Sequence, residues 1–476
     1  MATDTAVRFA IEPVTAEFEG ADLGDARRTK RLVRLAGQLA DVPGRSFPKS
    51  LVNTGDLEAG YRFFSNEHVS AEAISAPHRE RSWARGSQSD WLLSLEDTTE
   101  MRFTGGTQRA GLGRLMNDGQ GFYLHTSLLV SLDVGADRPI PLGVVDYEIL
   151  VRGERGPKRP WREEYADPNK ESLRWMRLMT RVDEAADAHL ASVIHVADRE
   201  ACKYELLAER AEQQRRFIIR VRGPFLDRAT RGPARRASVV REVDLSPRVT
   251  DSSGGRSARN GRAGRRATLT FQSCPVTLKR PKHVAKERAP EMQLKVVEVR
   301  EQNAPTGIEP VSWVLVTTEP IASDEDVLRV VDAYRARWMI EEYFKALKTG
   351  CAFETRQLDS LGSLETALAV FIPIAWQMLL LRGVVRDAPA TPPEQVLGPR
   401  LLILLVALAA PNLNRWGMKL SKKATAREVL YAIARMGGHL PNNGPPGWLT
   451  IRRGLDDLYA LDQAAQMLGL PRCDQS

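Results

Sequence analysis

The segment from about residue 91 to residue 222 alternates between short apolar runs and amphipathic stretches, and no other feature restricts the fold as strongly. Three strands are predicted from runs that are rich in apolar and β-branched residues and broken by Gly, Asp and Pro: WLLSLEDTT, GFYLHTSLLVSLD and PLGVVDYEIL. A helix, a strand, a helix and a strand follow: KESLRWMRLMTRVDEAA, SVIHVADRE, ACKYELLAERAEQQ and RRFIIRVRG. This order predicts an α/β fold with a mixed sheet flanked by helices.

A basic segment rich in Gly, Ser and Arg interrupts this pattern between Arg228 and Arg288. It holds 16 Lys and Arg against 4 Asp and Glu, a balance of +12 in a chain whose net charge is +8, so the other residues sum to −4. A charge this local indicates an electrostatic footprint for phosphates. The alternative is a disordered, solubilising loop, and both hold if the loop orders on contact. QLKVVEVRE and SWVLVTTEP then resume the strands.

Helical regions are predicted on both sides of this α/β region. At 476 residues the chain is long enough for about three domains. The first 75 residues are predicted to be helical, and GDARRTKRLVRLAGQLA is an amphipathic helix with a basic outer face. That face either lies on a nucleic-acid backbone or is an ordinary surface. The chain after about residue 370 is predicted to be all helical, and Ser323 with Asp326 predicts a capping box before the preceding helix.

Several classes of protein are disfavoured by the sequence. The four cysteines show no C-x-x-C spacing, which argues against a zinc site and a disulfide framework: Cys202, Cys274, Cys351 and Cys473. The N-terminal residues lack the pattern of a signal peptide. The longest apolar stretch, residues 367–381, contains Pro373 and Gln377 and is shorter than the ~20 residues that span a bilayer. We therefore expect buried helices in a soluble, reduced, cytoplasmic protein.

Three acids lie where a strand is predicted to end or on a helix with basic neighbours. Asp97 closes WLLSLE, Asp198 closes SVIHVA, and Glu341 lies on the helix YRARWMIEEYFKALK. Adjacent strands can bring two carboxylates within a few ångströms, and a helix can add a third. Oxygen ligands suit Mg²⁺ or Mn²⁺, and two such ions about 3.5–4 Å apart promote phosphodiester cleavage. The alternative is that these acids are ordinary turn residues and helix caps.

The helix that carries Glu341 has polar residues at intervals of 3, 4, 4 and 3, which places them on one stripe: Tyr334, Arg337, Glu341, Lys345 and Lys348. Ile340, Phe344 and Leu347 form a neighbouring apolar stripe. The polar stripe is either a solvated face, with an i,i+4 pair between Glu341 and Lys345, or a site that combines a carboxylate ligand with cations for phosphates.

Eight segments in this order along the chain carry a resemblance to a known family: LGDARRTKRLV, GYRFFSNEHVSAEAI, LEDTT, ADREA, RFIIRVR, WVLVTTEP, YRARWMIEEYFKALKTG and AIARMGGHL. The chain resembles the bacterial DDE transposases of the insertion-sequence-four family, and most closely the transposon-five type of cut-and-paste transposase. Tyr334, Arg337, Glu341 and Lys348 fit that family's signature Tyr-x-x-Arg-x-x-x-Glu-x-x-x-x-x-x-Lys. The resemblance runs from about Leu23 to the mid-440s.

The resemblance implies an RNase H-like core in which Asp97, Asp198 and Glu341 hold two Mg²⁺ ions, with Mn²⁺ as a substitute. It also implies contacts with DNA. Trp313 falls where the family keeps an aromatic residue that stacks on a flipped-out base. The other DNA-binding residues expected from the resemblance and from the basic N-terminal helix are Tyr334, Arg337, Lys345, Lys348, Arg220, Arg222, Arg27, Arg28 and Arg31.

The domains implied are an N-terminal helical domain for transposon-end DNA (1–75), a catalytic domain (76–370) with a β-rich basic insertion (about 223–312), and a C-terminal helical dimerisation domain (371–476). The implied enzyme binds terminal inverted repeats as a synaptic homodimer, nicks DNA, forms and reopens a hairpin, and joins 3′ ends to target DNA. Its partners are double-stranded DNA and a second copy, without a membrane, at the bacterial nucleoid. The alternatives are an inactive DNA-binding inhibitor of transposition and an RNase H-like structure-specific nuclease.

Overall fold

The computed structural model describes residues 12–51, 53–105, 108–116, 119–132, 138–153, 170–245, 264–387, 392–418, 420–421 and 423–468. The chain divides into two compact units. The first unit comprises Met1–Asp90, Thr98–Asp167 and Met339–Ser476, and the second comprises Trp91–Asp97 and Pro168–Trp338. Each unit therefore brings together segments that lie far apart in the sequence.

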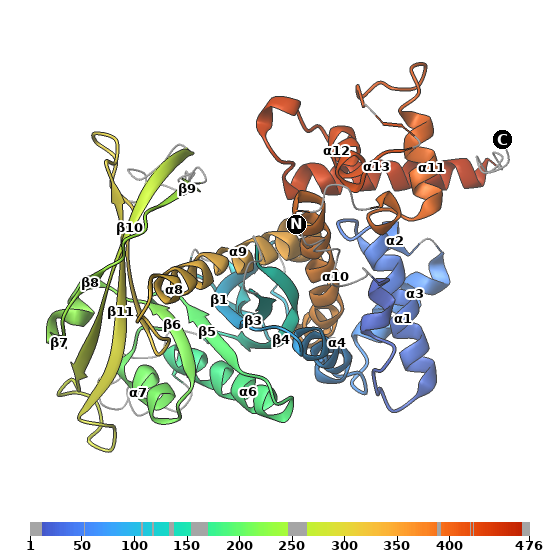
Figure 1. Cartoon of the computed structure of the whole chain (residues 1–476). Helices are drawn as coiled ribbons and strands as arrows, with labels where there is room; N and C mark the ends of the chain where they lie inside the picture. Colours follow the sequence, from blue (N-terminus) through green and yellow to red (C-terminus); the bar gives the residue numbers. More distant parts are fainter. Residues whose placement is uncertain are drawn as a thin grey trace. The chain divides into compact units, whose positions relative to one another are not determined.

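The second unit is built on a mixed sheet with flanking helices, as the alternation of elements predicts (Figure 1). Its strands lie in the order β1, β5, β6, β12, β11 and β10, with β7, β8 and β9 paired to β10. Strand β5 is parallel to β1 and β6, and the other pairs for which the register is described are antiparallel. The strands span Leu92–Phe103 (β1, of which Leu92–Asp97 belongs to this unit), Val193–Ala197 (β5), Arg216–Arg220 (β6), Ala229–Arg231 (β7), Arg235–Arg236 (β8), Arg241–Leu245 (β9), Arg265–Lys279 (β10), Glu291–Gln302 (β11) and Ser312–Thr317 (β12).

Helices pack on this sheet through apolar side chains. Trp175, Leu207 and Phe217 share one buried cluster, which joins two helices to the strands. The capping box predicted at Ser323 is present, because its hydroxyl accepts from Asp326 N while the Asp326 carboxylate accepts from Ser323 N. The helices of this unit are η2 (Glu171–Leu173), α6 (Arg174–Ala188), α7 (Tyr204–Glu212), η3 (Gly223–Arg228) and α8 (Asp324–Ala336).

The described part of the basic segment contributes the strands β7, β8, β9 and β10, with loops between and after them. β10 and β11 run antiparallel with a continuous register from Thr268 opposite Gln302 to Lys279 opposite Glu291 (Figure 1). Many of its arginines are held by acids of the same unit, as in the pairs Arg265–Glu301 (2.7 Å) and Arg231–Glu298 (2.6 Å). These arginines stabilise the insertion through ion pairs. The count of charges in the sequence could not show that they have acidic partners. Residues 246–263 of the segment lie outside the described residues.

The first unit combines helices from both ends of the chain with a small group of strands. The second half of β1, Thr98–Phe103, lies beside β3 (Gln120–Ser131), which also pairs with β2 (Gly113–Arg114) and β4 (Ile140–Leu150). The N-terminal helices are η1 (Val14–Glu17), α1 (Ala26–Asp41), α2 (Phe47–Ser50), α3 (Thr54–Phe64) and α4 (Ala71–Gly86). The later ones are α9 (Trp338–Lys345), η5 (Ala346–Gly350), η6 (Phe353–Thr355), α10 (Leu361–Asp387), η7 (Pro393–Gln395), α11 (Pro399–Leu408), α12 (Ala426–Met436), η8 (Pro441–Asn443) and α13 (Trp448–Met467).

Helix α10 is longer than the apolar stretch from which it was predicted. It runs for 27 residues, and its window Leu361–Gly383 is long and apolar enough, by length and composition, to cross a membrane. Of that window 78% is buried inside the protein, and the indole of Trp376 donates to Pro141 O at 3.0 Å. This burial favours the core helix that the sequence predicted.

Two expectations about local structure are wrong. Asp97 does not end a strand, because β1 continues to Phe103, where its second half pairs with β3 and Phe103 packs on Phe122. The stretch YRARWMIEEYFKALK is not one regular helix. Helix α8 ends at Ala336, α9 begins at Trp338 after a turn at Arg337, and the last residues form the π-helical turn η5. Arg337 keeps right-handed helical dihedral angles, so the clear departure from the predicted 3.6-residue spacing is the π-helical turn η5, which contains Lys348.

Candidate functional site

Asp97 and Asp198 lie on neighbouring parallel strands of the second unit. The register pairs Leu92 with Val193 and continues to Leu95 opposite Val196. Continued by two residues, this register places Asp97 level with Asp198, which directly follows the end of β5. Neighbouring strands lie about 4.8 Å apart, and residues at one level of parallel strands point to the same face. The extended register therefore sets two of the three predicted carboxylates at one level of the sheet.

Each of these acids has a polar partner. Arg337 Nη1 donates to Asp97 Oδ2 at 2.9 Å, and the two side chains are 14% and 22% exposed. Asp198 Oδ1 accepts from Glu200 N at 2.7 Å, which is the local bond of an Asx turn. Asp198 thus serves the turn that the alternative interpretation assumed, yet it stays partly accessible. The guanidinium of Arg337, which is expected to contact phosphates, lies on this carboxylate and neutralises it.

The donor set fits a hard divalent cation. Both carboxylates supply oxygen only, and the guanidinium of Arg337 shows that positive charge is accommodated against Asp97. The third acid, Glu341, belongs to the first unit. Among the described residues, no group of three or more His, Cys, Asp or Glu stands close enough to hold a metal ion. The three-carboxylate site stays a prediction.

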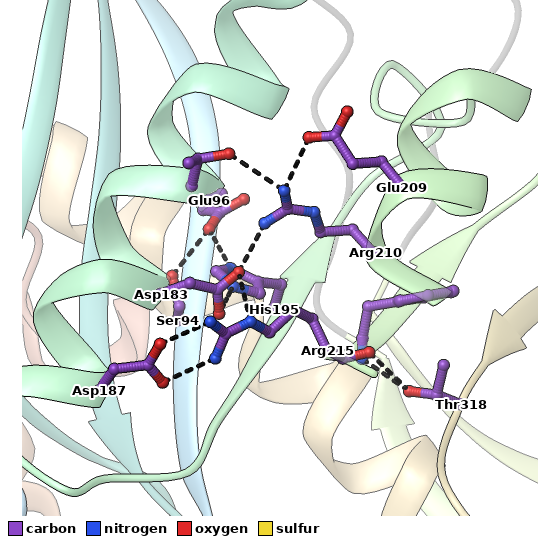
Figure 2. Close-up of polar contacts among 11 residues, drawn as sticks. Ser94, Glu96, Asp183, Asp187, His195, Glu209, Arg210, Arg215 and Thr318 are labelled. Atoms are coloured by element: carbon purple, nitrogen blue, oxygen red, sulfur yellow. Dashed lines mark hydrogen bonds and ion pairs between the residues drawn. The ribbon is translucent and has the colours of Figure 1, made fainter. Parts of the chain in front are cut away.

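A buried charged network includes Glu96, the residue before Asp97, and was not predicted from the sequence (Figure 2). His195 on β5 contacts Glu96 Oε1 through Nδ1 at 2.6 Å and Asp183 Oδ1 through Nε2 at 3.1 Å. Arg210 donates to Asp183 Oδ2 at 2.5 Å, and the Ser94 hydroxyl donates to Glu96 Oε1 at 2.8 Å. His195 and Glu96 are fully buried. The network ties β1 and β5 together next to the level at which Asp97 and Asp198 meet.

His195 is an imidazolium in this network, because both of its ring nitrogens face carboxylate oxygens and must donate. Burial alone would lower the pKa of His195. The negative charge of Glu96, with the hydrogen bonds to Asp183 and Glu96, outweighs burial and raises that pKa to about 9. The only sequence signal was one histidine in the otherwise apolar run SVIHVA, a pattern that is equally typical of a buried core histidine.

The other predicted DNA-binding residues of the second unit differ in their contacts and exposure. Trp313 on β12 packs edge-on against Tyr334, with ring centroids 5.6 Å apart, and Tyr334 is 6% exposed. Arg220 donates to Ser312 O at 3.4 Å. Arg222 is exposed. Trp313 and Tyr334 are therefore brought together, which the sequence spacing could not show.

The remaining cations of the signature belong to the first unit. Lys345 pairs with Glu342 at 2.8 Å. The sequence suggested a pair with Glu341, the preceding residue. Lys348 donates to Glu100 O at 2.8 Å and pairs with Glu354 at 3.3 Å. Both lysines thus have partners inside the protein.

The basic face of α1 is partly structural. Arg31 and Arg34 pair with Asp56 at 3.2 and 2.6 Å, which joins α1 to α3. Arg28 donates to Leu23 O at 3.0 Å. Arg27 is 91% exposed and pairs with Asp25, the residue that caps the helix. Of the three predicted DNA contacts on this helix, Arg27 is the most accessible.

Comparison with known proteins matches two regions of the chain to family models. Residues 12–69 match the family model "Transposase DNA-binding", and residues 176–372 match "Transposase DDE domain". The second range contains Asp198, Glu341 and the signature helix, whereas Asp97 lies before it. A cryo-EM structure of the piggyBac transposase synaptic complex with hairpin DNA is 11% identical over 80% of this chain and 66% of that chain, with a TM-score of 0.27. A score this low supports no conclusion about this chain. The two family matches show that the chain combines a transposase DNA-binding domain with a DDE transposase domain.

Proposed function

We propose that this chain is a cut-and-paste DNA transposase of the transposon-five type in the insertion-sequence-four family. The single observation that carries the proposal is the parallel register of β1 and β5 in a chain with a DDE transposase domain, because this register, extended by two residues, sets Asp97 level with Asp198. The same sheet order, with β5 parallel to both β1 and β6, supports an RNase H-like core.

Asp97, Asp198 and Glu341 would hold two Mg²⁺ ions, for which Mn²⁺ would substitute. When bound, these ions supply charge for the attacking and leaving oxygens of an in-line displacement. Arg337 already lies on Asp97 at 2.9 Å, so its guanidinium is placed to pass from that carboxylate to a DNA phosphate. Trp313 supplies a π-surface for a flipped-out base, and Tyr334 orients that surface through the edge-on contact.

The reaction is a series of phosphoryl transfers. Water attacks the phosphodiester at the transposon end, and the 3′-oxygen leaves as a hydroxyl. That hydroxyl attacks the opposite strand to form a hairpin, and the 3′-hydroxyl of the flanking DNA leaves. A second water attacks the hairpin phosphodiester, which gives a 5′-phosphate and releases the transposon 3′-hydroxyl. This hydroxyl attacks a phosphodiester of the target DNA, and a 3′-hydroxyl of the target strand leaves. The cations that would neutralise the phosphates are Arg337, Lys345, Lys348, Arg220 and Arg222, with Arg27, Arg28 and Arg31 on the end-binding domain.

We further propose that residues 1–75 bind the terminal repeats, residues 76–370 catalyse, and the helices after residue 371 form a synaptic homodimer. A bacterial cytoplasmic protein that associates with the nucleoid fits this activity. The buried network of His195 serves as a rigid support that keeps β1 and β5 in register.

The test is cleavage of a labelled duplex that carries the element's own terminal repeat and flanking DNA, with and without Mg²⁺. We expect metal-dependent nicking at the junction, then a hairpin, and neither product from Asp97→Ala. If both proteins bind the ends and neither cleaves, the chain is a non-catalytic DNA-binding protein. If the wild type cleaves branched DNA without defined ends, it is a structure-specific nuclease.

A further inference from the structure

A basic cavity of about 630 Å³ opens in the second unit, and its lining includes Arg199, the residue that follows Asp198. Nothing in the proposed chemistry uses most of its lining. The residues that matter here are Arg174, Trp175, Arg199, Lys203, Arg222 and Phe225. They come from the start of α6, from the turn between β5 and α7, and from the segment that follows β6. The cavity therefore lies at the carboxyl ends of two parallel strands, where α/β sheets commonly bind ligands.

The charge of this cavity is not balanced by the protein. Arg174 is neutralised, because its Nη2 pairs with Glu200 at 2.8 Å. Arg199, Lys203 and Arg222 are exposed, and within the described part of the chain no carboxylate pairs with them. Arginines of the insertion such as Arg265 have acidic partners instead. Three unbalanced cations around one hollow favour an anionic ligand.

The local backbone adds to this preference. Helix α7 begins at Tyr204, directly after Lys203, and no side chain caps its N-terminus. The amides of its first turn thus supply positive partial charge beside the cations. By contrast, the thiol of Cys202 brings no reactivity, because burial raises its pKa to about 12 and keeps it protonated.

The remaining wall is apolar and aromatic. Trp175 belongs to the buried cluster of this unit, and Phe225 packs against that cluster while it stays partly exposed. A hollow that pairs cations with aromatic side chains has the two features that bind unpaired nucleotides, which are phosphate neutralisation and stacking of a base. A base inside a duplex cannot enter such a hollow, because its edges and faces are occupied by its neighbours.

We propose that this cavity binds one unpaired DNA nucleotide next to the catalytic carboxylates. Arg199, Lys203 and Arg222 neutralise its phosphates, and its base rests on Phe225. The inference rests on the proposed function, since it assigns a binding position to the DNA nucleotide next to the proposed catalytic residue Asp198. It adds a second position for an unpaired base, because Trp313 does not line this cavity.

The experiment measures binding, in EDTA so that no cleavage is needed, of fluorescent terminal-repeat duplexes. One duplex is blunt, and two others carry a three-nucleotide single-stranded extension at the 3′ or the 5′ end. We expect at least one extended duplex to bind about tenfold more tightly than the blunt one. Lys203→Ala and Phe225→Ala each remove most of this gain and leave blunt-duplex binding near wild type.

Two controls separate this result from misfolding or from a general loss of charge. Lys203→Arg keeps the charge and is expected to keep the gain, and Lys423→Ala removes an exposed lysine outside the cavity and is expected to change nothing. Equal binding of all three duplexes, or equal behaviour of Lys203→Ala and Lys423→Ala, would overturn the cavity assignment. Both results are independent of whether the wild type nicks DNA, so failure of the proposed function is recognised separately.

Discussion

At the scale of the residue, the buried imidazolium of His195 predicts how stability depends on pH. Its pKa in the folded protein, about 9, lies above the unfolded value of about 6.5. The stabilisation it provides is therefore complete below about pH 6.5 and is lost as the pH rises through about 9. We expect the free energy of unfolding to fall on the order of 3 kcal/mol across this interval. Urea unfolding at pH 6.5 and 9.5 measures this loss.

The matched variant for this measurement is His195→Asn, which cannot carry a charge. It should be less stable than the wild type at pH 6.5 because Glu96 and Asp183 lose their shared cation. It should also lose less stability than the wild type on going to pH 9.5. Parallel losses in the two proteins would show that the alkaline sensitivity arises elsewhere.

A second consequence at this scale concerns the two carboxylates. Because Asp97 and Asp198 are proposed to act as one unit, either Asp→Ala change should lower nicking by about 10³-fold or more, and the double variant should be no worse. Initial rates of nicking on an end duplex give the comparison. Multiplicative losses would indicate that the two acids act in separate steps.

At the scale of the element, the sequence predicted the strands and helices well but not how they are joined. Apolar alternation located β1, β3, β4, β5 and β6, because burial of one or both faces imposes that pattern. The length of β1 and the turn at Arg337 could not be predicted from local patterns. The first depends on the pairing of β1 with β3, and the second lies at the contact between Arg337 and Asp97, 240 residues away. The same holds for the pairing of insertion arginines with acids.

The hairpin of β10 and β11 offers a test with two adjacent arginines. Arg265 is 12% exposed and bonds through both Nε and Nη2 to Glu301, which is 2% exposed, whereas Arg266 is 72% exposed beside Glu242. Arg265→Ala leaves a buried carboxylate without its cation, so we expect about 3 kcal/mol less stability. Arg266→Ala should stay within about 0.5 kcal/mol.

Thermal unfolding of the two variants gives these differences, and hydrogen exchange of the strand amides shows where they act. The expected pattern is faster exchange in β10 and β11 for Arg265→Ala alone. Equal effects of the two substitutions would mean that the insertion is held by its backbone ladder rather than by this buried pair.

At the scale of the whole molecule, the first unit is assembled from three separated segments, and one buried cation joins two of them. Arg356 is 2% exposed and donates to the carbonyl oxygens of Pro43, Arg45 and Cys351. Its guanidinium also lies over the ring of Phe371, 4.4 Å from the centroid. Burial lowers its pKa to about 10, which still leaves it charged at neutral pH. No sequence pattern distinguishes Arg356, because its partners are backbone carbonyls, two of them more than 300 residues away.

Arg356→Leu removes this link and leaves three buried carbonyl groups without their donor. Each such group costs about 1–3 kcal/mol, so we expect the free energy of unfolding to fall by about 3 kcal/mol or more. Arg415→Leu, which alters an exposed arginine stacked on Trp416, is the control and should be nearly neutral. Because the second unit does not contain Arg356, its unfolding should be unchanged by the substitution. Limited proteolysis that releases a resistant fragment of the second unit would support this, and loss of both units at one denaturant concentration would show that they unfold together.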